Sequence, residues 1–129
     1  MQQTDKDTKQ FFIGLIADEQ YRELALSVLP ELEDRLNAAI GLRAFSTEIE
    51  RIYLTVIVSS ETEAEGEYEL KGNKLFLNVV ISGEPAEQLS KRRFLSLVGQ
   101  GIVDQLGRVE EVPEEVVEEV QRVIDNFLF

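Results

Sequence analysis

The chain carries five glutamates at alternate positions, and these carboxylates are its clearest candidates for binding chemistry. They are Glu61, Glu63, Glu65, Glu67 and Glu69. In an extended strand, alternate side chains lie on one face and repeat about every 6.6 Å, a spacing comparable to that of successive phosphates on a nucleic-acid strand. The row therefore predicts a surface for a cationic partner, and it would imitate a phosphate backbone.

A solvated strand face is the alternative explanation, in which charge keeps one side of a half-covered sheet soluble and prevents edge pairing. Against it, like charges in one row repel one another, and glutamate has low strand propensity. If the row is a binding surface, we expect the neighbouring strands to complete it. The binding residues expected from those strands are Tyr53, Ile57, Phe76 and Asn78.

Other kinds of site chemistry have little support in the sequence. The chain has no histidine and no cysteine, so acid–base catalysis by histidine, thiolate metal sites, cysteine nucleophiles and disulfides are all excluded. Gly99 and Gly101 lack the preceding strand and third glycine of a nucleotide-binding loop, and close helix packing explains them better. The glutamate row also lacks the Asp- and Asn-rich loop of calcium sites. We expect no catalytic residue, no cofactor and no metal site.

Length and charge limit the class of protein. The 129 residues, 43% hydrophobic and 29% charged, predict a flexible segment over residues 1–9 and a single α+β domain over residues 10–129. Twenty-five acids against thirteen bases give a net charge of −12, which repels nucleic acids and anionic membranes and favours a basic partner. No apolar run is long enough to cross a membrane. We expect a cytoplasmic protein, either a monomer or a homodimer.

The first element that positions these side chains is a helix. Apolar residues recur at helical spacing from Tyr21 to Ile40, and Gly41 suits its C-cap. Asp18 is one candidate for the start of this helix. We favour a longer helix that begins near Thr8, although residues 10–17 also suit a strand. Pro30 lies inside the pattern and predicts a kink.

A three-stranded antiparallel meander follows, over residues 49–58, 59–70 and 74–82. The first and last of these segments alternate apolar and polar residues, and Gly72 and Asn73 suit the positive φ values of a two-residue hairpin turn. If Lys71 faces Lys74, the turn pairs apolar residues on one face of the hairpin. Those pairs are Leu70 with Leu75 and Tyr68 with Leu77.

Two helices complete the chain. The first is expected to begin at Ser82 or Glu84 and to end at Gly107, and the second has Pro113 in its first turn. The acids of the last helix are explained by its amphipathic character, because they would form its solvent-exposed face. They are Glu114, Glu115, Glu118 and Glu119. The sequence therefore predicts an α+β fold with a long N-terminal helix, the meander, and two C-terminal helices packed on one sheet face.

These features predict a non-catalytic acidic protein-binding module, such as an immunity protein or inhibitor that neutralises a basic bacterial nuclease toxin. The chain is similar to small acidic immunity proteins in its length, charge and order of elements. The first alternative is a secretion-type chaperone that binds an effector segment as a homodimer. The second is a carboxylate-based enzyme, which would need a deep pocket with buried carboxylates close to one another.

Overall fold

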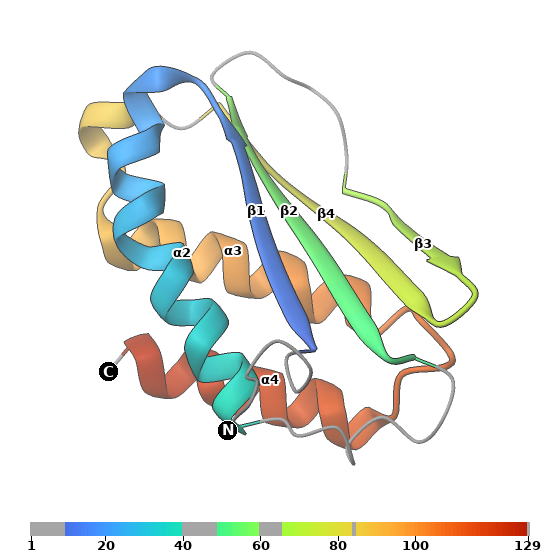
Figure 1. Cartoon of the computed structure of the whole chain (residues 1–129). Helices are drawn as coiled ribbons and strands as arrows, with labels where there is room; N and C mark the ends of the chain where they lie inside the picture. Colours follow the sequence, from blue (N-terminus) through green and yellow to red (C-terminus); the bar gives the residue numbers. More distant parts are fainter. Residues whose placement is uncertain (1–9, 40–48, 60–65, 84, 129) are drawn as a thin grey trace, which may run out of the picture.

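The computed structural model describes residues 10–39, 49–59, 66–83 and 85–128 of the chain. Strands and helices are mixed along this part of the sequence (Figure 1). They follow in the order β1 (Phe11–Ala17), α2 (Glu19–Ala39), β2 (Arg51–Ser59), β3 (Tyr68–Lys71), β4 (Lys74–Ser82), a 3-10 turn η2 (Ala86–Gln88), α3 (Lys91–Leu106) and α4 (Glu114–Leu128). The predicted α+β class is confirmed. Residues 1–9, predicted to form a separate segment, lie outside the described residues.

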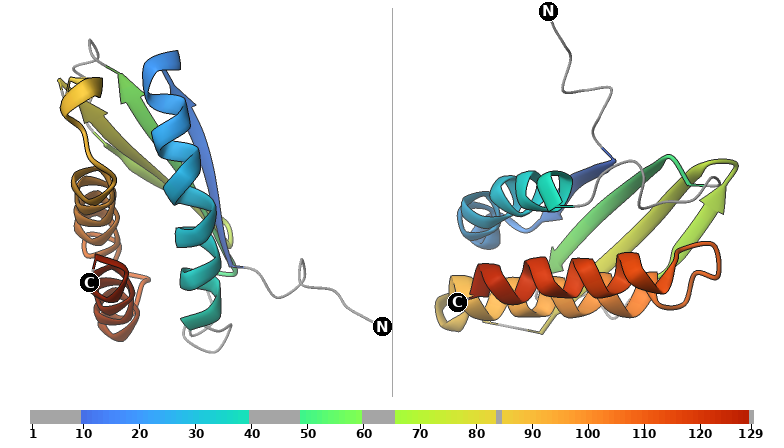
Figure 2. Two further views of the ribbon diagram at one scale, coloured as in Figure 1. Left: turned by 90° about the vertical axis from the view of Figure 1, so that its left-hand side faces the viewer. Right: turned by 90° about the horizontal axis from the view of Figure 1, so that it is seen from below.

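The four strands form one mixed sheet in the order β1-β2-β4-β3. β1 pairs with β2 and β2 with β4 in parallel, whereas β3 pairs with β4 in the antiparallel sense. The helices lie on one side of this sheet (Figure 2). α2 packs on β1 and α3 packs on β4, while α4 packs mainly on α2 and α3. The inward residues of β2 and β4 form the centre of the core, in contact with these helices.

The predicted long N-terminal helix is wrong in its first part, because residues 11–17 form β1. This run is apolar throughout, so it has no period that separates a helix from a strand buried beside a parallel neighbour. Ile13, Leu15 and Ala17 pack against the core. The alternative start was right: Asp18 directly precedes α2, and its carbonyl accepts a hydrogen bond from Tyr21 N at 3.0 Å. α2 continues through Pro30. Gly41, the expected C-cap, lies outside the described residues.

The predicted meander is also wrong, because β4 lies between β2 and β3. β2 and β4 are nine-residue apolar strands, and each buries a full set of alternate residues. The four-residue β3 is more polar, so it occupies the edge. The hairpin itself is confirmed, with Lys71 opposite Lys74 and Tyr68 opposite Leu77. Of the two turn residues, Gly72 adopts a positive φ of 60°, as in a type II′ turn, whereas Asn73 does not.

Side chains of α2 form hydrogen bonds with backbone groups on the outer edge of β1. Asn37 Oδ1 accepts hydrogen bonds from Gln10 N at 2.8 Å and Phe11 N at 2.9 Å, and Asn37 Nδ2 donates to Phe11 O at 3.0 Å. Glu33 Oε2 accepts from Ile13 N at 2.8 Å. Over the first three residues of β1 the helix therefore supplies the partners that a further strand would have supplied, which protects this part of the edge from pairing with another chain.

α3 begins later than predicted, because a 3-10 turn precedes it and Ser90 forms its N-cap, accepting from Arg93 N at 3.1 Å. Its end at Gly107 is as predicted. Close packing at the two helix glycines is confirmed. A Cβ at Gly99 would lie 2.6 Å from Ile124 Cγ2 of α4, and a Cβ at Gly101 would lie 2.6 Å from Val79 Cγ1 of β4. α4 starts directly after Pro113, as expected.

Candidate functional site

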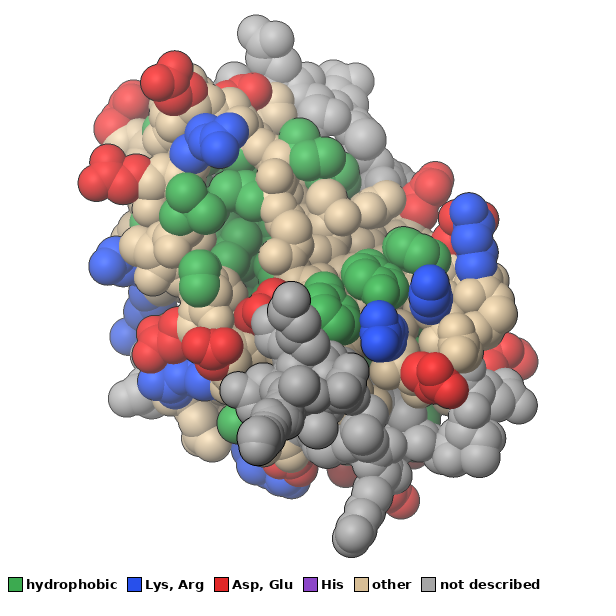
Figure 3. Space-filling model, in the orientation of Figure 1, with side chains coloured by type: hydrophobic (Ala, Val, Ile, Leu, Met, Phe, Trp, Pro, Cys, Tyr) green, Lys and Arg blue, Asp and Glu red, His purple; other side chains and the backbone are tan. Residues whose placement is uncertain are grey.

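The sheet face turned away from the helices, here called the open face, presents its side chains in rows. Because side chains alternate along each strand, the register aligns outward residues across the sheet. From the hairpin end these are a basic row (Arg51, Lys74, Lys71), an aromatic row (Phe12, Tyr53, Phe76), a small row (Gly14, Thr55, Asn78) and an aliphatic row (Ile16, Ile57, Val80). Figure 3 shows this face, where basic side chains lie beside a line of hydrophobic ones.

The rings of the aromatic row stack on one another. The centroids of Phe12 and Tyr53 lie 5.2 Å apart with planes inclined by 20°, and those of Tyr53 and Phe76 lie 5.3 Å apart with planes inclined by 17°. At the two ends, the Arg51 guanidinium carbon is 5.9 Å from the Phe12 centroid, and Lys71 Nζ is 6.0 Å from that of Phe76. Both faces of the Tyr53 ring are therefore occupied, and Tyr53 covers one face of Phe12 and one face of Phe76. Stacking of nucleobases needs free ring faces, so this row suits apolar protein groups better.

The structure brings together the four binding residues predicted from the neighbouring strands, since Tyr53, Ile57, Phe76 and Asn78 all lie on the open face. Glu69 lies in β3, at the end of the aromatic row opposite Phe76. It is exposed and pairs with Lys71 at 3.6 Å.

Glu67, the other described member of the glutamate row, is placed less centrally than expected. Glu67 directly precedes β3, and its carbonyl accepts from Asn78 N at 2.9 Å. Glu61, Glu63 and Glu65 lie outside the described residues. Because β4 separates β3 from β2, the located glutamates stand at the edge of the sheet and are not flanked by two apolar strands.

Two residues of the open face were missed at the level of sequence. Phe12 and Ile16 are outward residues of β1, and Ile16 is 62% exposed. Assignment of this run to a helix concealed them. Because the run is apolar on both faces, no alternation within it marked these two residues as outward.

A second surface, here called the acidic surface, covers α4 and the turn before it. Its members are exposed acids. They are Glu110, Glu111, Glu114, Glu115, Glu118 and Asp125. Residues 110–129 hold seven acids and one base, a net charge of −6 that is half of the chain's −12. That base, Arg122, pairs with Glu119. The acidic surface belongs to the helical layer, on the other side of the sheet from the open face (Figure 2).

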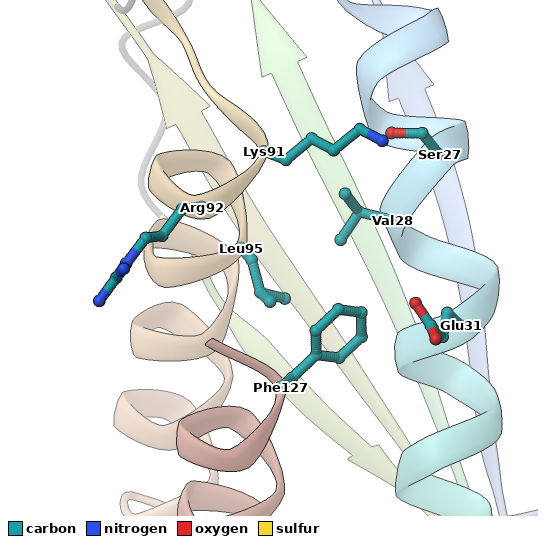
Figure 4. Close-up of a pocket in the computed structure, with 7 residues that line it drawn as sticks. All are labelled: Ser27, Val28, Glu31, Lys91, Arg92, Leu95 and Phe127. Atoms are coloured by element: carbon teal, nitrogen blue, oxygen red, sulfur yellow. The ribbon is translucent and has the colours of Figure 1, made fainter. Parts of the chain in front are cut away.

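A groove of about 260 Å³ lies where α2, α3 and α4 meet (Figure 4). Val28, Leu95 and Phe127 form its apolar lining. Lys91 reaches across it toward Ser27, while its neighbour Arg92 points away, as expected for successive helix positions (Figure 4). The groove is slightly smaller than the usual range of ligand pockets, about 300 to 1,000 Å³.

Arg35 contacts two residues that line this groove. Its guanidinium lies 4.3 Å from the centroid of the Phe127 ring and pairs with Glu31 at 3.4 Å. Within the described residues, no three His, Cys, Asp or Glu side chains are placed to hold a metal ion, and no helix is long and apolar enough to cross a membrane. Comparisons with protein-family models, curated proteins and solved structures found no match.

Proposed function

We propose that this chain is a non-catalytic protein-binding module that takes a basic partner protein on the acidic surface. The observation that carries the proposal is the segregation of charge. Half of the net charge lies in the last twenty residues, on exposed side chains of one helix and its preceding turn. A surface of this kind raises the rate at which a basic partner is encountered and selects against acidic ones.

The spacing of these acids supports a binding role. Glu114 and Glu118 are neighbours at i and i+4 on α4, where like charges destabilise a helix and a lysine would stabilise it. Glu114 and Glu115 gain some compensation from the positive end of the helix dipole, because they occupy its first turn. Glu118 and Asp125 are too far along the helix for that effect. Cations supplied by a partner would offset the repulsion.

An inhibitor or immunity protein for a basic nuclease toxin is the specific form of this proposal. Nucleases present basic surfaces to the phosphate backbone, and an acidic helix face competes for the same surface. The absence of histidine and cysteine from the whole chain accords with a role that needs no catalysis.

The test compares two triple variants that remove the same charge from different surfaces. Partners are captured from cells that make the protein, and the captured protein is then titrated at two salt concentrations. Glu114→Gln/Glu115→Gln/Glu118→Gln should weaken binding about tenfold or more, mainly through slower and less salt-sensitive association. The matched control, Glu19→Gln/Glu23→Gln/Asp34→Asn, changes exposed acids of α2 and should bind nearly as the wild type does.

Equal losses in the two triple variants would show that net charge alone attracts the partner, without a specific surface. Unchanged affinity in the α4 variant would refute the proposal. Glu67→Gln/Glu69→Gln tests the located part of the glutamate row in the same assay. Inhibition of a nuclease activity by the wild type would establish the specific form.

A secretion-type chaperone is the second candidate, and the open face favours it. Ile16 and Phe76 are exposed there, and such chaperones bind an extended effector segment on apolar surface as a homodimer. The identity of the captured partner separates the two functions, because a secreted effector would favour the chaperone and a basic toxin the inhibitor.

A further inference from the structure

The open face exposes two apolar rows on β1, β2 and β4, the aromatic and the aliphatic, with the small row between them, and apolar surface gathered on one face in this way marks an interaction surface. Ile16 is 62% exposed and Phe76 is 37% exposed, and Tyr53, Ile57 and Val80 are partly exposed. We propose that this face binds a second copy of the same chain, forming a dimer whose twofold axis runs along the small row. The dimer does not depend on the proposed function, because α4 lies on the other side of the sheet (Figure 2).

The size of the face suits a reversible dimer. β2 and β4 extend about 26 Å, β1 about 20 Å and the edge strand β3 about 10 Å, so at a spacing of about 4.8 Å the face measures roughly 400 Å² per copy. Two copies would therefore bury roughly 800 Å² in total, an area that corresponds to a weak and transient association. A symmetric pair is also the commonest assembly of identical chains.

Charge selects the direction of the axis. An axis parallel to the strands would place the basic row of one copy on the basic row of the other, so that bases face bases. An axis across the strands makes the rows of the second copy run in the opposite order to those of the first. The basic row then faces the far end of the strands, where Asp18 follows β1 and accepts a hydrogen bond from Ser59 Oγ at 3.2 Å. This arrangement brings opposite charges toward each other.

The same axis matches the remaining rows. The aromatic row of each copy faces the aliphatic row of the other, so Phe76 lies over Val80 of its mate. Thr55 and Asn78 face their own counterparts on the axis, and a hydroxyl or an amide can both donate and accept hydrogen bonds. Packed sheets cross at about 30°, which lets the aromatic and aliphatic ridges interdigitate.

The first test measures association by sedimentation equilibrium across a wide range of concentration. The wild type should form a reversible dimer. Thr55→Arg should raise the dimer dissociation constant by at least about tenfold, because symmetry places the new charge in the interface twice. The control Leu26→Arg, at an exposed position of α2, should dimerise like the wild type. The melting temperature of dilute samples verifies that Thr55→Arg is folded.

The second test determines the direction of the twofold axis by cross-linking introduced cysteines, because the chain has no cysteine of its own. Lys74 lies at one end of β4 and Ser82 at the other. The axis across the strands places Lys74 of one copy over Ser82 of the other copy. A mixture of Lys74→Cys and Ser82→Cys chains should therefore form cross-linked dimers with a short bis-maleimide. Lys74→Cys alone should not, because its two copies would lie about 26 Å apart.

Two results would overturn the proposal. One is a wild type that stays monomeric at every concentration. If Thr55→Arg also abolishes binding of the captured basic partner in that case, the open face is the binding site of that partner. The other is efficient cross-linking of Lys74→Cys to itself, which would require bases to face bases.

Discussion

At the scale of single residues, the two glycines of α3 set the distance between this helix and its neighbours. Gly101→Ala should lower the free energy of unfolding by about 1 to 3 kcal/mol, because its Cβ would meet Val79 and overpack the core. Gly99→Ala should do the same through Ile124. Gln100→Ala is the matched control, since this residue lies between the glycines and is exposed. Urea denaturation measures all three.

A second substitution tests the cause of that loss. Val79→Ala removes the methyl group that the new Cβ would meet, so Gly101→Ala should cost much less in the Val79→Ala background. If the cost is the same in both backgrounds, helix propensity or another contact determines it. Alanine favours helices over glycine by about 1 kcal/mol, so propensity alone would make Gly101→Ala stabilising.

At the scale of elements, the contact between α2 and β1 depends on one amide. Asn37→Ala removes the partners of Gln10 N, Phe11 N and Phe11 O and leaves an edge strand with unsatisfied backbone groups. The expected loss is about 2 to 4 kcal/mol of unfolding free energy, with faster amide hydrogen exchange at Phe11. Asn126→Ala, at an exposed position of α4, should have little effect on either measurement.

Intermediate loss in Asn37→Asp would support this account, because the aspartate keeps the acceptor and loses the donor. A stability loss in Asn37→Ala without faster exchange at Phe11 would contradict it. The proximity of Glu33, whose carbonyl accepts from Asn37 Nδ2 at 3.0 Å, makes some repulsion in the aspartate variant expected.

The elements also show what a single sequence can predict. The hairpin at Gly72 was predictable because its turn and its alternating pairs lie within a few residues of one another. The insertion of β4 between β2 and β3 was not, since parallel pairing joins residues far apart in sequence and no local signal encodes it. For the same reason the hydrogen bonds of Asn37 left no trace in the helical pattern of α2. Four of the predicted binding residues were placed together because strand alternation alone determines their face.

At the scale of the whole molecule, the acidic surface and the exposed aromatic and aliphatic rows lie on opposite sides of the sheet. The helical layer carries the acidic surface, and the open face carries aromatic and aliphatic rows beside a basic one. The outward positions of β1, β2 and β4, all of them described, include no acidic residue. On the open face, the described acids therefore lie at its margins, Glu69 on the edge strand β3 and Asp18 after β1, and the central positions where two copies would meet carry none.

This separation predicts opposite salt dependences for the two interactions. Two copies of charge −12 repel at long range, and added salt shortens the Debye length to about 8 Å at physiological ionic strength. The dimer should therefore strengthen several-fold from low to physiological salt, as measured by sedimentation equilibrium. Binding of the basic partner should weaken over the same range, because the same screening removes an attraction. Glu114→Gln/Glu115→Gln/Glu118→Gln should reduce both dependences, since it lowers the charge responsible for each. If the dimer instead weakens with salt, contacts between the basic row and Asp18 outweigh the repulsion of the two copies, and charge at the interface rather than over the whole molecule governs assembly.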